Sequence, residues 1–217
     1  MTSRSLLAVG AAAAAGLGMA GPASAAVIAT DRPCYVENQP MLIGGQQFAP
    51  NSNYTVKTDQ LFAFGNADAA GNWLSNTETA PIVVKRTTVP QPFTLTATQD
   101  GVEVATAQFN VVNLLVTLAS TRGRPTGRTT WRVSGFTPGQ SVYVHVRRGG
   151  KTLRNVRLGR ADAPCGRLTT KQRRLPGISS RTLRRGTYDL YVDNKRTFSR
   201  STRPQYRSSV TVFTVFR

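Results

Sequence analysis

The sequence predicts an all-β protein in which two antiparallel β-sandwich domains follow a signal peptide. Short segments of alternating apolar and polar residues recur along the chain, rich in β-branched and aromatic side chains. Proline and glycine interrupt these segments every eight to twelve residues, as they do between strands of sandwiches and barrels. No long window has the spacing of an amphipathic helix. These three observations together predict a strand-only fold.

The first 26 residues have the composition of a secretory signal peptide. A basic start at Arg4 leads into an apolar Leu/Ala/Gly stretch, which ends in the small-residue sequence "PASAA". The apolar stretch is too short to span a bilayer, and no other segment is apolar enough to do so. We therefore expect an exported chain, with domains at residues 27–113 and 114–217.

Two pairs of segments show that the second domain repeats the first. "GGQQFAPNSNYTV" (44–56) parallels "VSGFTPGQSVYVHV" (133–146), and "FGNADAAGNWL" (64–74) parallels "LGRADAPCGRL" (158–168). We expect Phe48 and Phe136 to enter the core at a strand end. We expect Gly71 and Gly166 to adopt a positive φ in the Ala-Asp turn. The loop is therefore expected to be a structural turn.

Later segments complete the predicted strands. "TAQFNVV" (106–112) runs almost directly into "LLVTLAS" (114–120), so the two domains are expected to be a restrained pair. Residues 141–159 read as a hairpin with Gly149-Gly150 at the turn. In its first strand, alternate valines (142, 144 and 146) share one face, and His145 lies on the other. Tyr188, Leu190 and Val192 share the inward face of a later strand.

The segments "NADAAGNWLSNTETAP" and "FTLTATQDGVEVATAQFNV" resemble bacterial Ig-like repeats of secreted and surface proteins. The "GxxFxP" anchor is similar to the IPT/TIG subgroup. The resemblance covers most of residues 33–112. In the second half "RRGTYDLYVDN" matches the late strand, whereas Cys165 interrupts the turn. The resemblance implies two Ig-like domains and carries little information on function.

Two cysteines, Cys34 and Cys165, are too few for a disulfide-framework fold. Three arrangements are open: an intramolecular bond, two buried thiols, and an intermolecular bridge. In an extended pair Cys34 is expected to lie far from the second domain, so that a bond implies a folded-back pair.

Catalytic and metal-binding patterns are weak. His145 is the one histidine of the chain, and Asp189 or Asp193 could orient it, but no nucleophile motif accompanies it. We expect an exposed strand histidine, no catalytic residue, no cofactor and no metal. A calcium site on Asp68 with two asparagines, 66 and 72, is a remote alternative because one carboxylate is few for this ion.

The two predicted domains differ sharply in charge. Residues 27–113 carry four Lys/Arg against seven Asp/Glu, whereas residues 114–217 carry 23 against three, and the whole chain has a net charge of +18. Twenty of those 23 cations are arginine, which can bind phosphate or carboxylate bidentately. A further cluster occurs at 195–200. The candidate anion-binding residues are Arg147, Arg148, Lys151, Arg154, Arg157, Arg160, Lys171, Arg173, Arg174, Arg181, Arg184 and Arg185.

This asymmetry favours a secreted, non-enzymatic module whose second domain binds anionic cell-envelope polymers or lipids, with the cell wall as the site of attachment. Other surface proteins are further candidate partners; extracellular nucleic acid is disfavoured because no nucleic-acid-binding motif appears. Two alternatives remain. One is a structural or protein-interaction subunit whose arginines are only a solvated surface. The other is a hydrolase or enzyme accessory that uses His145.

Overall fold

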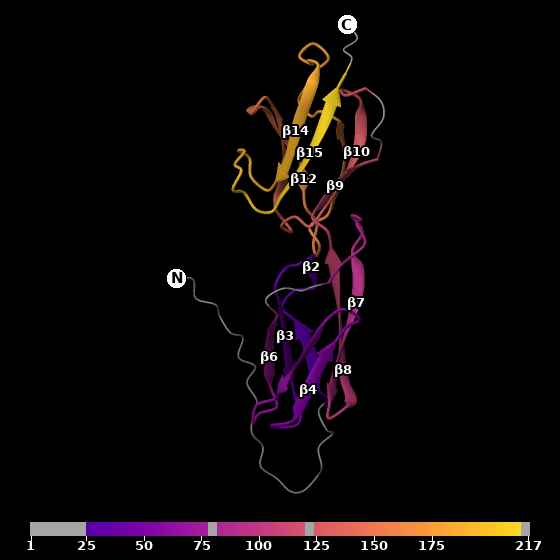
Figure 1. Ribbon diagram of the computed structural model, residues 1–217, viewed down its shortest axis with the longest axis vertical. Coiled ribbons are helices and arrows are strands. Elements are labelled where there is room, and N and C mark those ends of the chain that lie inside the picture. Colours follow the sequence, from indigo (N-terminus) through magenta and orange to yellow (C-terminus); the bar gives the residue numbers. More distant parts are fainter. Residues whose placement is uncertain (1–24, 78–81, 120–123, 214–217) are drawn as a thin grey trace.

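The computed structural model describes residues 25–77, 82–119 and 124–213. Within these residues the protein is all-β, with fifteen strands in four sheets and no helix. The predicted signal peptide lies almost entirely outside the described residues. No helix in the described part of the chain could cross a membrane. Figure 1 shows an elongated molecule, with residues 25–113 (the N-terminal half) and 114–213 (the C-terminal half) stacked end to end.

The N-terminal half contains two sheets. One has the strand order β1-β3-β6 and the other β2-β8-β7-β4-β5, and every pairing is antiparallel except the parallel pair of β2 with β8. The strands are β1 (Val27–Thr30), β2 (Cys34–Val36), β3 (Met41–Gln46), β4 (Asn53–Lys57), β5 (Phe62–Asn66), β6 (Trp73–Thr77), β7 (Gln91–Gln99) and β8 (Val102–Val112).

The C-terminal half also contains two sheets, with the orders β13-β10-β9 and β12-β11-β14-β15. All of their pairings are antiparallel. The strands are β9 (Leu115–Leu118), β10 (Arg128–Ser134), β11 (Ser141–Arg148), β12 (Lys151–Arg160), β13 (Leu168–Arg173), β14 (Gly186–Asp193) and β15 (Gln205–Val212).

Each half has its own apolar core, built from the alternate residues of its strands. In the N-terminal half Ile43 of β3, Val56 of β4 and Leu95 of β7 are fully buried. In the C-terminal half the predicted inward valines of β11 are fully buried together with Leu190 of β14 and Trp131 of β10. The predicted alternation of β11 and β14 is therefore confirmed for the apolar positions.

The repeated anchors occupy equivalent positions in the two halves. The Phe48 N–H donates to the carbonyl oxygen of Gly71 at 3.0 Å, and the Phe136 N–H to that of Gly166 at 3.4 Å. Both glycines have positive φ, 76° and 60°. A Cβ added at either one would overlap the carbonyl oxygen of its phenylalanine. Each Ala-Asp loop thus closes over a buried phenylalanine, and only glycine fits there.

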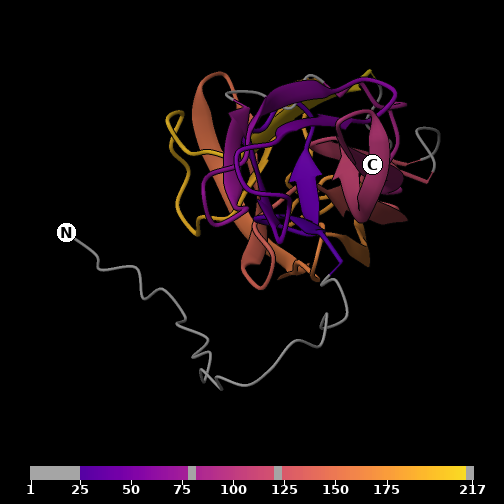
Figure 2. The same ribbon diagram turned by 90° about the horizontal axis from the view of Figure 1, so that it is seen from below.

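A short and restrained junction joins the halves. Two residues separate β8 from β9, and the hydroxyl of Ser134 donates to the carbonyl oxygen of Asn113 at 2.8 Å. Cys34 and Cys165 form a disulfide bond, which packs on Val112. Seen along the long axis in Figure 2, strands of one half lie over those of the other.

The structure corrects the expected position of Cys34. The sequence suggested that Cys34 would lie far from the second half, but β2 pairs in parallel with the end of β8, so that Cys34 lies opposite Asn110. This pairing brings Cys34 to the junction, where Cys165 lies in the Ala-Asp turn of the second half. The bond therefore forms in an end-to-end arrangement and needs no folding back (Figure 1).

Candidate functional site: a basic face on the second half

The β13-β10-β9 sheet buries one face and exposes the other. Trp131 and Val133 of β10 point into the core, each 1% exposed, and the Trp131 indole N–H donates to the carbonyl oxygen of Arg173 at 3.2 Å. Because side chains alternate along a strand, Arg132, which lies between these two residues, and Arg128, three residues before Trp131, point outward. Both are exposed.

The register of β10 with β13 brings four cations together on this outer face. Arg128 lies directly opposite Arg173, and Lys171 is opposite Thr130, diagonal to both Arg128 and Arg132. Directly opposite residues have Cβ atoms about 4.5–5.5 Å apart, and diagonal ones about 7–8 Å. We define the basic face as Arg128, Arg132, Lys171 and Arg173.

The charges of the basic face lack a balancing acid. Within the described ranges, none of its four cations forms a salt bridge. Like charges directly opposite each other on a sheet are destabilising. The pair Arg128–Arg173 therefore costs stability in the free protein, and a bound anion would remove that cost. Exposed guanidinium groups in this arrangement can each offer a bidentate contact to a phosphate or carboxylate.

Sequence reasoning identified only half of this face. Lys171 and Arg173 were among the candidates, whereas Arg128 and Arg132 were not. They were missed because they stand apart in the sequence and form no charge cluster. The signal was the alternation "RTTWRV" (128–133), in which a buried tryptophan at position 131 fixes which residues face outward.

The other candidates lie elsewhere on the C-terminal half. Arg147 and Arg148 are in β11, Lys151, Arg154, Arg157 and Arg160 are in β12, and Arg174, Arg181, Arg184 and Arg185 follow β13. Several of their guanidinium groups donate to backbone carbonyls: Arg148 to Arg185 at 2.5 Å, Arg154 to Gly177 at 3.3 Å, and Arg147 to Gly150. Arg147 also lies over the Phe198 ring, 4.0 Å from its centroid.

Arg174 requires a correction. It is 7% exposed, whereas a residue that binds a polymer must reach solvent. Its backbone N–H donates to the carbonyl oxygen of Gly127 at 2.9 Å, where the chain leaves β13 and turns into the core beside Leu175. Arg174 therefore belongs to the interior of the fold and leaves the candidate set.

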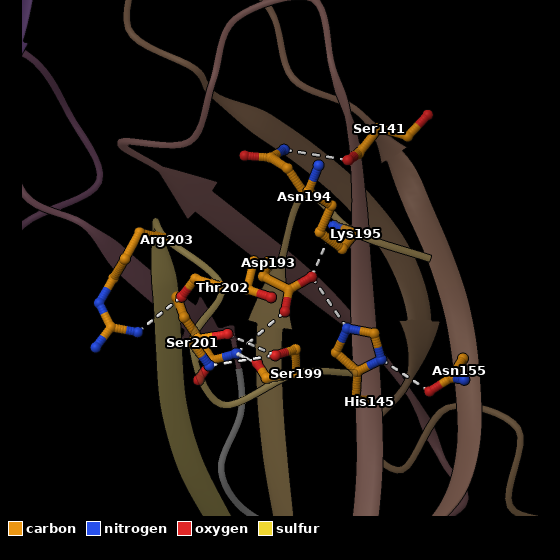
Figure 3. Close-up of polar contacts among 11 residues, drawn as sticks. Ser141, His145, Asn155, Asp193, Asn194, Lys195, Ser199, Ser201, Thr202 and Arg203 are labelled. Atoms are coloured by element: carbon orange, nitrogen blue, oxygen red, sulfur yellow. Dashed lines mark hydrogen bonds and ion pairs between the residues drawn. The ribbon is translucent and has the colours of Figure 1, made fainter. Parts of the chain in front are cut away.

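His145 also differs from expectation. It lies on the predicted face of β11, but residues 194–204, which connect β14 to β15, cover that face and leave the imidazole fully buried. The Phe198 ring packs edge-on against it at 5.6 Å between centroids. Figure 3 shows its ring nitrogens hydrogen-bonded to Asn155 (Nδ1, 2.8 Å) and Asp193 (Nε2, 3.0 Å).

Burial alone lowers the pKa of His145, but the hydrogen bonds to Asp193 and Asn155 and the charge of Asp193 outweigh it, so that the pKa is raised above its usual value. Because both ring nitrogens are occupied and the ring is inaccessible, His145 cannot accept a proton from a nucleophile or reach a substrate. The arrangement is that of a structural anchor.

The Ala-Asp loop is a hydrogen-bonded turn. One carboxylate oxygen of Asp68, Oδ1, accepts the N–H groups of Ala70 and Asn72, both at 2.8 Å. The carboxylate thus stabilises its own backbone, as the structural interpretation predicted. No group of three or more metal-ligating side chains occurs in the described part of the chain.

A hollow of about 430 Å³ lies at the junction between the halves. It is lined mainly by apolar groups, which include Tyr35, Phe136, Pro164 and the disulfide. At its edge the Tyr35 hydroxyl donates to Asp31 at 2.6 Å, and burial together with this bond raises the pKa of Tyr35 to about 12. Tyr35 is therefore neutral and anchors the turn that leads into β2.

Comparisons with known proteins assign no family. No protein-family model and no curated protein matches the sequence. Among solved structures, a carbohydrate acetylesterase from Xanthomonas citri is 23% identical over 39% of this chain and 19% of the esterase, with a TM-score of 0.27. The human OSCAR ligand-binding domain is 10% identical over 86% of this chain and 97% of that domain, with a TM-score of 0.35.

A Ca²⁺-stabilised adhesin with which an Antarctic bacterium binds ice is 13% identical over 86% of this chain and 48% of the adhesin, with a TM-score of 0.34. The chain thus spans about a fifth of the esterase and about half of the adhesin. These partial likenesses establish neither a common ancestry nor a shared activity. The all-β class rests on the strands themselves.

Proposed function

We propose that the protein is a secreted, non-enzymatic binding module. In this proposal residues 1–26 are a signal peptide, and residues 27–113 and 114–217 are two Ig-like β-sandwich domains. The second domain binds a phosphate-rich polymer of the cell envelope. The first domain acts as a near-neutral spacer that holds the second at the surface.

The observation that carries this proposal is the basic face. Four exposed cations lie on neighbouring strands, and two of them, Arg128 and Arg173, are directly opposite each other. A sheet that served stability alone would place an acid or a neutral residue at one of these positions. The flat arrangement fits an extended polyanion, because successive phosphates can contact successive cations along the sheet.

The experiment measures binding of the full mature chain to purified bacterial cell walls across a salt series. Arg132→Gln/Lys171→Gln removes two charges from the basic face and leaves the opposed arginine pair intact. Lys85→Gln/Arg86→Gln removes two exposed charges from the N-terminal half and is the matched control. At about 0.5–1 kcal/mol for each exposed contact, we expect the first variant to bind about 5- to 30-fold more weakly. The control should bind like the parent.

Three further probes identify the source of the anion. Walls stripped of their phosphate polymers should lose binding, whereas duplex DNA and anionic lipid vesicles should bind more weakly than intact walls. Counterion release predicts that the slope of log K against log[salt], where K is the binding constant, is shallower by about 1–2 in the basic-face variant than in the parent. Equal binding by parent, variant and control at physiological salt would refute the proposal and leave a solvated basic surface.

A second candidate function, protein interaction through the first half, is favoured by one observation. Phe62 and Phe64 on the edge strand β5 are 64% and 75% exposed, with ring centroids 5.9 Å apart. Exposed apolar patches commonly mark interaction sites. Phe62→Ser/Phe64→Ser should abolish any self-association seen by sedimentation; an unchanged profile would remove self-association as its role.

A further inference from the structure

The connection between β14 and β15, residues 194–204, is a second strongly basic element. We call it the basic loop. It carries four exposed cations, Lys195, Arg196, Arg200 and Arg203, and its sequence "NKRTFSRSTRP" contains no acid. Phe198 anchors its centre to the outer face of the sheet, with its ring 4.8 Å from that of Tyr191 between centroids.

Asp193, the carboxylate that precedes the loop in the sequence, does not neutralise the loop at the surface. Its side chain is fully buried at the base of the loop. As Figure 3 shows, one of its oxygens accepts from His145 at 3.0 Å and from the Lys195 N–H at 2.7 Å. The other accepts from the Gln205 amide at 3.1 Å. Asp193 thus holds the loop in place from below, and within the described residues none of the four loop cations forms a salt bridge.

A shallow, open hollow of about 590 Å³ lies against the basic loop. Its lining consists of three cationic residues and four hydroxyl residues: Lys195, Arg196, Arg203, Thr197, Ser199, Ser201 and Thr202. Among the described residues, no carboxylate lines it. The Arg203 guanidinium donates to the loop carbonyls of Arg200 and Thr202 at 3.1 and 2.8 Å, which fixes one cation at its edge. Cations with hydroxyl donors and no acid are the groups that bind an oxyanion.

The hollow and the basic face point in opposite directions. The two sheets of the C-terminal half bury their inner faces in one core. The basic face is the outer surface of β13-β10-β9, whereas the basic loop covers the outer surface of β12-β11-β14-β15. A short anionic segment that lies along one surface therefore does not reach the other.

We propose that the basic loop is a second oxyanion site, and that one protein molecule binds two strands of a phosphate polymer at once, one on each outer face of its second half. This inference rests on the proposed function, since it takes the basic face as the first site. The protein would then cross-link the polymer that it binds.

The test is a two-strand capture assay with the full mature chain. Linear inorganic polyphosphate is fixed to a surface, protein is bound, the surface is washed, and fluorescent polyphosphate is added. We expect the parent to capture the second strand. Lys195→Gln/Arg196→Gln and Arg132→Gln/Lys171→Gln should each still bind the fixed strand but capture at least about fivefold less of the second one. Lys85→Gln/Arg86→Gln should capture as much as the parent.

The outcomes separate the two proposals. If the loop variant captures the second strand as well as the parent, the second site is refuted and the basic face stands. If the basic-face variant binds the fixed strand as tightly as the parent and also captures the second strand as well as the parent, the basic face is refuted. A dimer could also capture the second strand, and in a dimer both single-site variants would still capture it because each molecule keeps one site. Capture by both single-site variants would therefore overturn bridging by one molecule. Circular dichroism of each variant checks that the sheets are intact.

Discussion

Arg128 and Arg173 face each other across β10 and β13 on an exposed sheet surface. Their mutual repulsion destabilises the folded protein when no anion is bound. We expect Arg128→Gln to increase the free energy of unfolding by about 0.2–1 kcal/mol at low ionic strength. The gain should shrink in 1 M salt, where the Debye length is about 3 Å. Denaturant titrations at both salt concentrations measure it, with Arg86→Gln as the control. A loss of stability at low salt would contradict the prediction.

The glycine of the second Ala-Asp turn should be irreplaceable. Gly166→Ala forces an L-residue into positive φ and places its Cβ against the carbonyl oxygen of Phe136. Gly150→Ala also requires a positive φ, but no atom lies within 4 Å of its added Cβ. We expect Gly150→Ala, in the hairpin turn, to lower the free energy of unfolding by about 1–2 kcal/mol because of the backbone conformation alone.

Gly166→Ala should lower the free energy of unfolding by about 1–3 kcal/mol more than Gly150→Ala does, because its backbone must also move away from the clash with Phe136. Equilibrium unfolding of the two variants gives the difference directly. Equal losses would mean that the overlap with Phe136 is relieved without cost.

The junction disulfide should stabilise the protein substantially. It joins residues 131 positions apart, and bonds that close long loops restrict the unfolded chain most. We expect Cys34→Ser/Cys165→Ser to lower the free energy of unfolding by about 2–5 kcal/mol. Because each half has its own core, both should still fold, and small-angle scattering should report a broader range of angles between them. Unchanged stability with unchanged scattering would show that the junction holds without the bond.

The buried histidine gives a pH-dependent contribution to stability. Its pKa is raised in the folded protein, so that this contribution is fully present below the unfolded value near 6.5 and is lost as pH rises through the folded pKa. The chain has one histidine, and its imidazole proton resonance can therefore be followed without ambiguity. We expect a midpoint above 6.5 in the parent and a lower one in Asp193→Asn. A midpoint below 6.5 in the parent would contradict the hydrogen-bonded arrangement.

The sequence predicted what local alternation controls. The valines of β11 and the apolar positions of β14 point inward as expected, and the repeated Phe and Gly anchors lie where the pattern placed them. Alternation assigned His145 to the correct face of β11 as well. It could not show that the face is covered, because residues 194–204 have no periodicity that indicates where they pack.

The sequence did not predict which distant strands pair with each other. The position of Cys34 depends on the parallel register of β2 with β8, which joins segments about 75 residues apart and leaves no local signal. The basic face was missed for a related reason. Arg128 and Arg173 become neighbours only through the register of β10 with β13, whereas a charge cluster in the sequence contains only neighbours along the chain.

The connectivity of the junction has a mechanical consequence. Cys34 lies only seven residues after the start of β1, whereas Cys165, which also lies at the junction, comes about halfway along the sequence of the second half. Tension applied at the N-terminal end, against a second half held on a surface, passes through the bond from Cys34 to Cys165. Residues 35–127 of the loop that the bond closes then lie outside the line of force, because the cations of the basic face begin at Arg128. While the bond is intact, a pull can strip β1 from β3, but it cannot extend these residues.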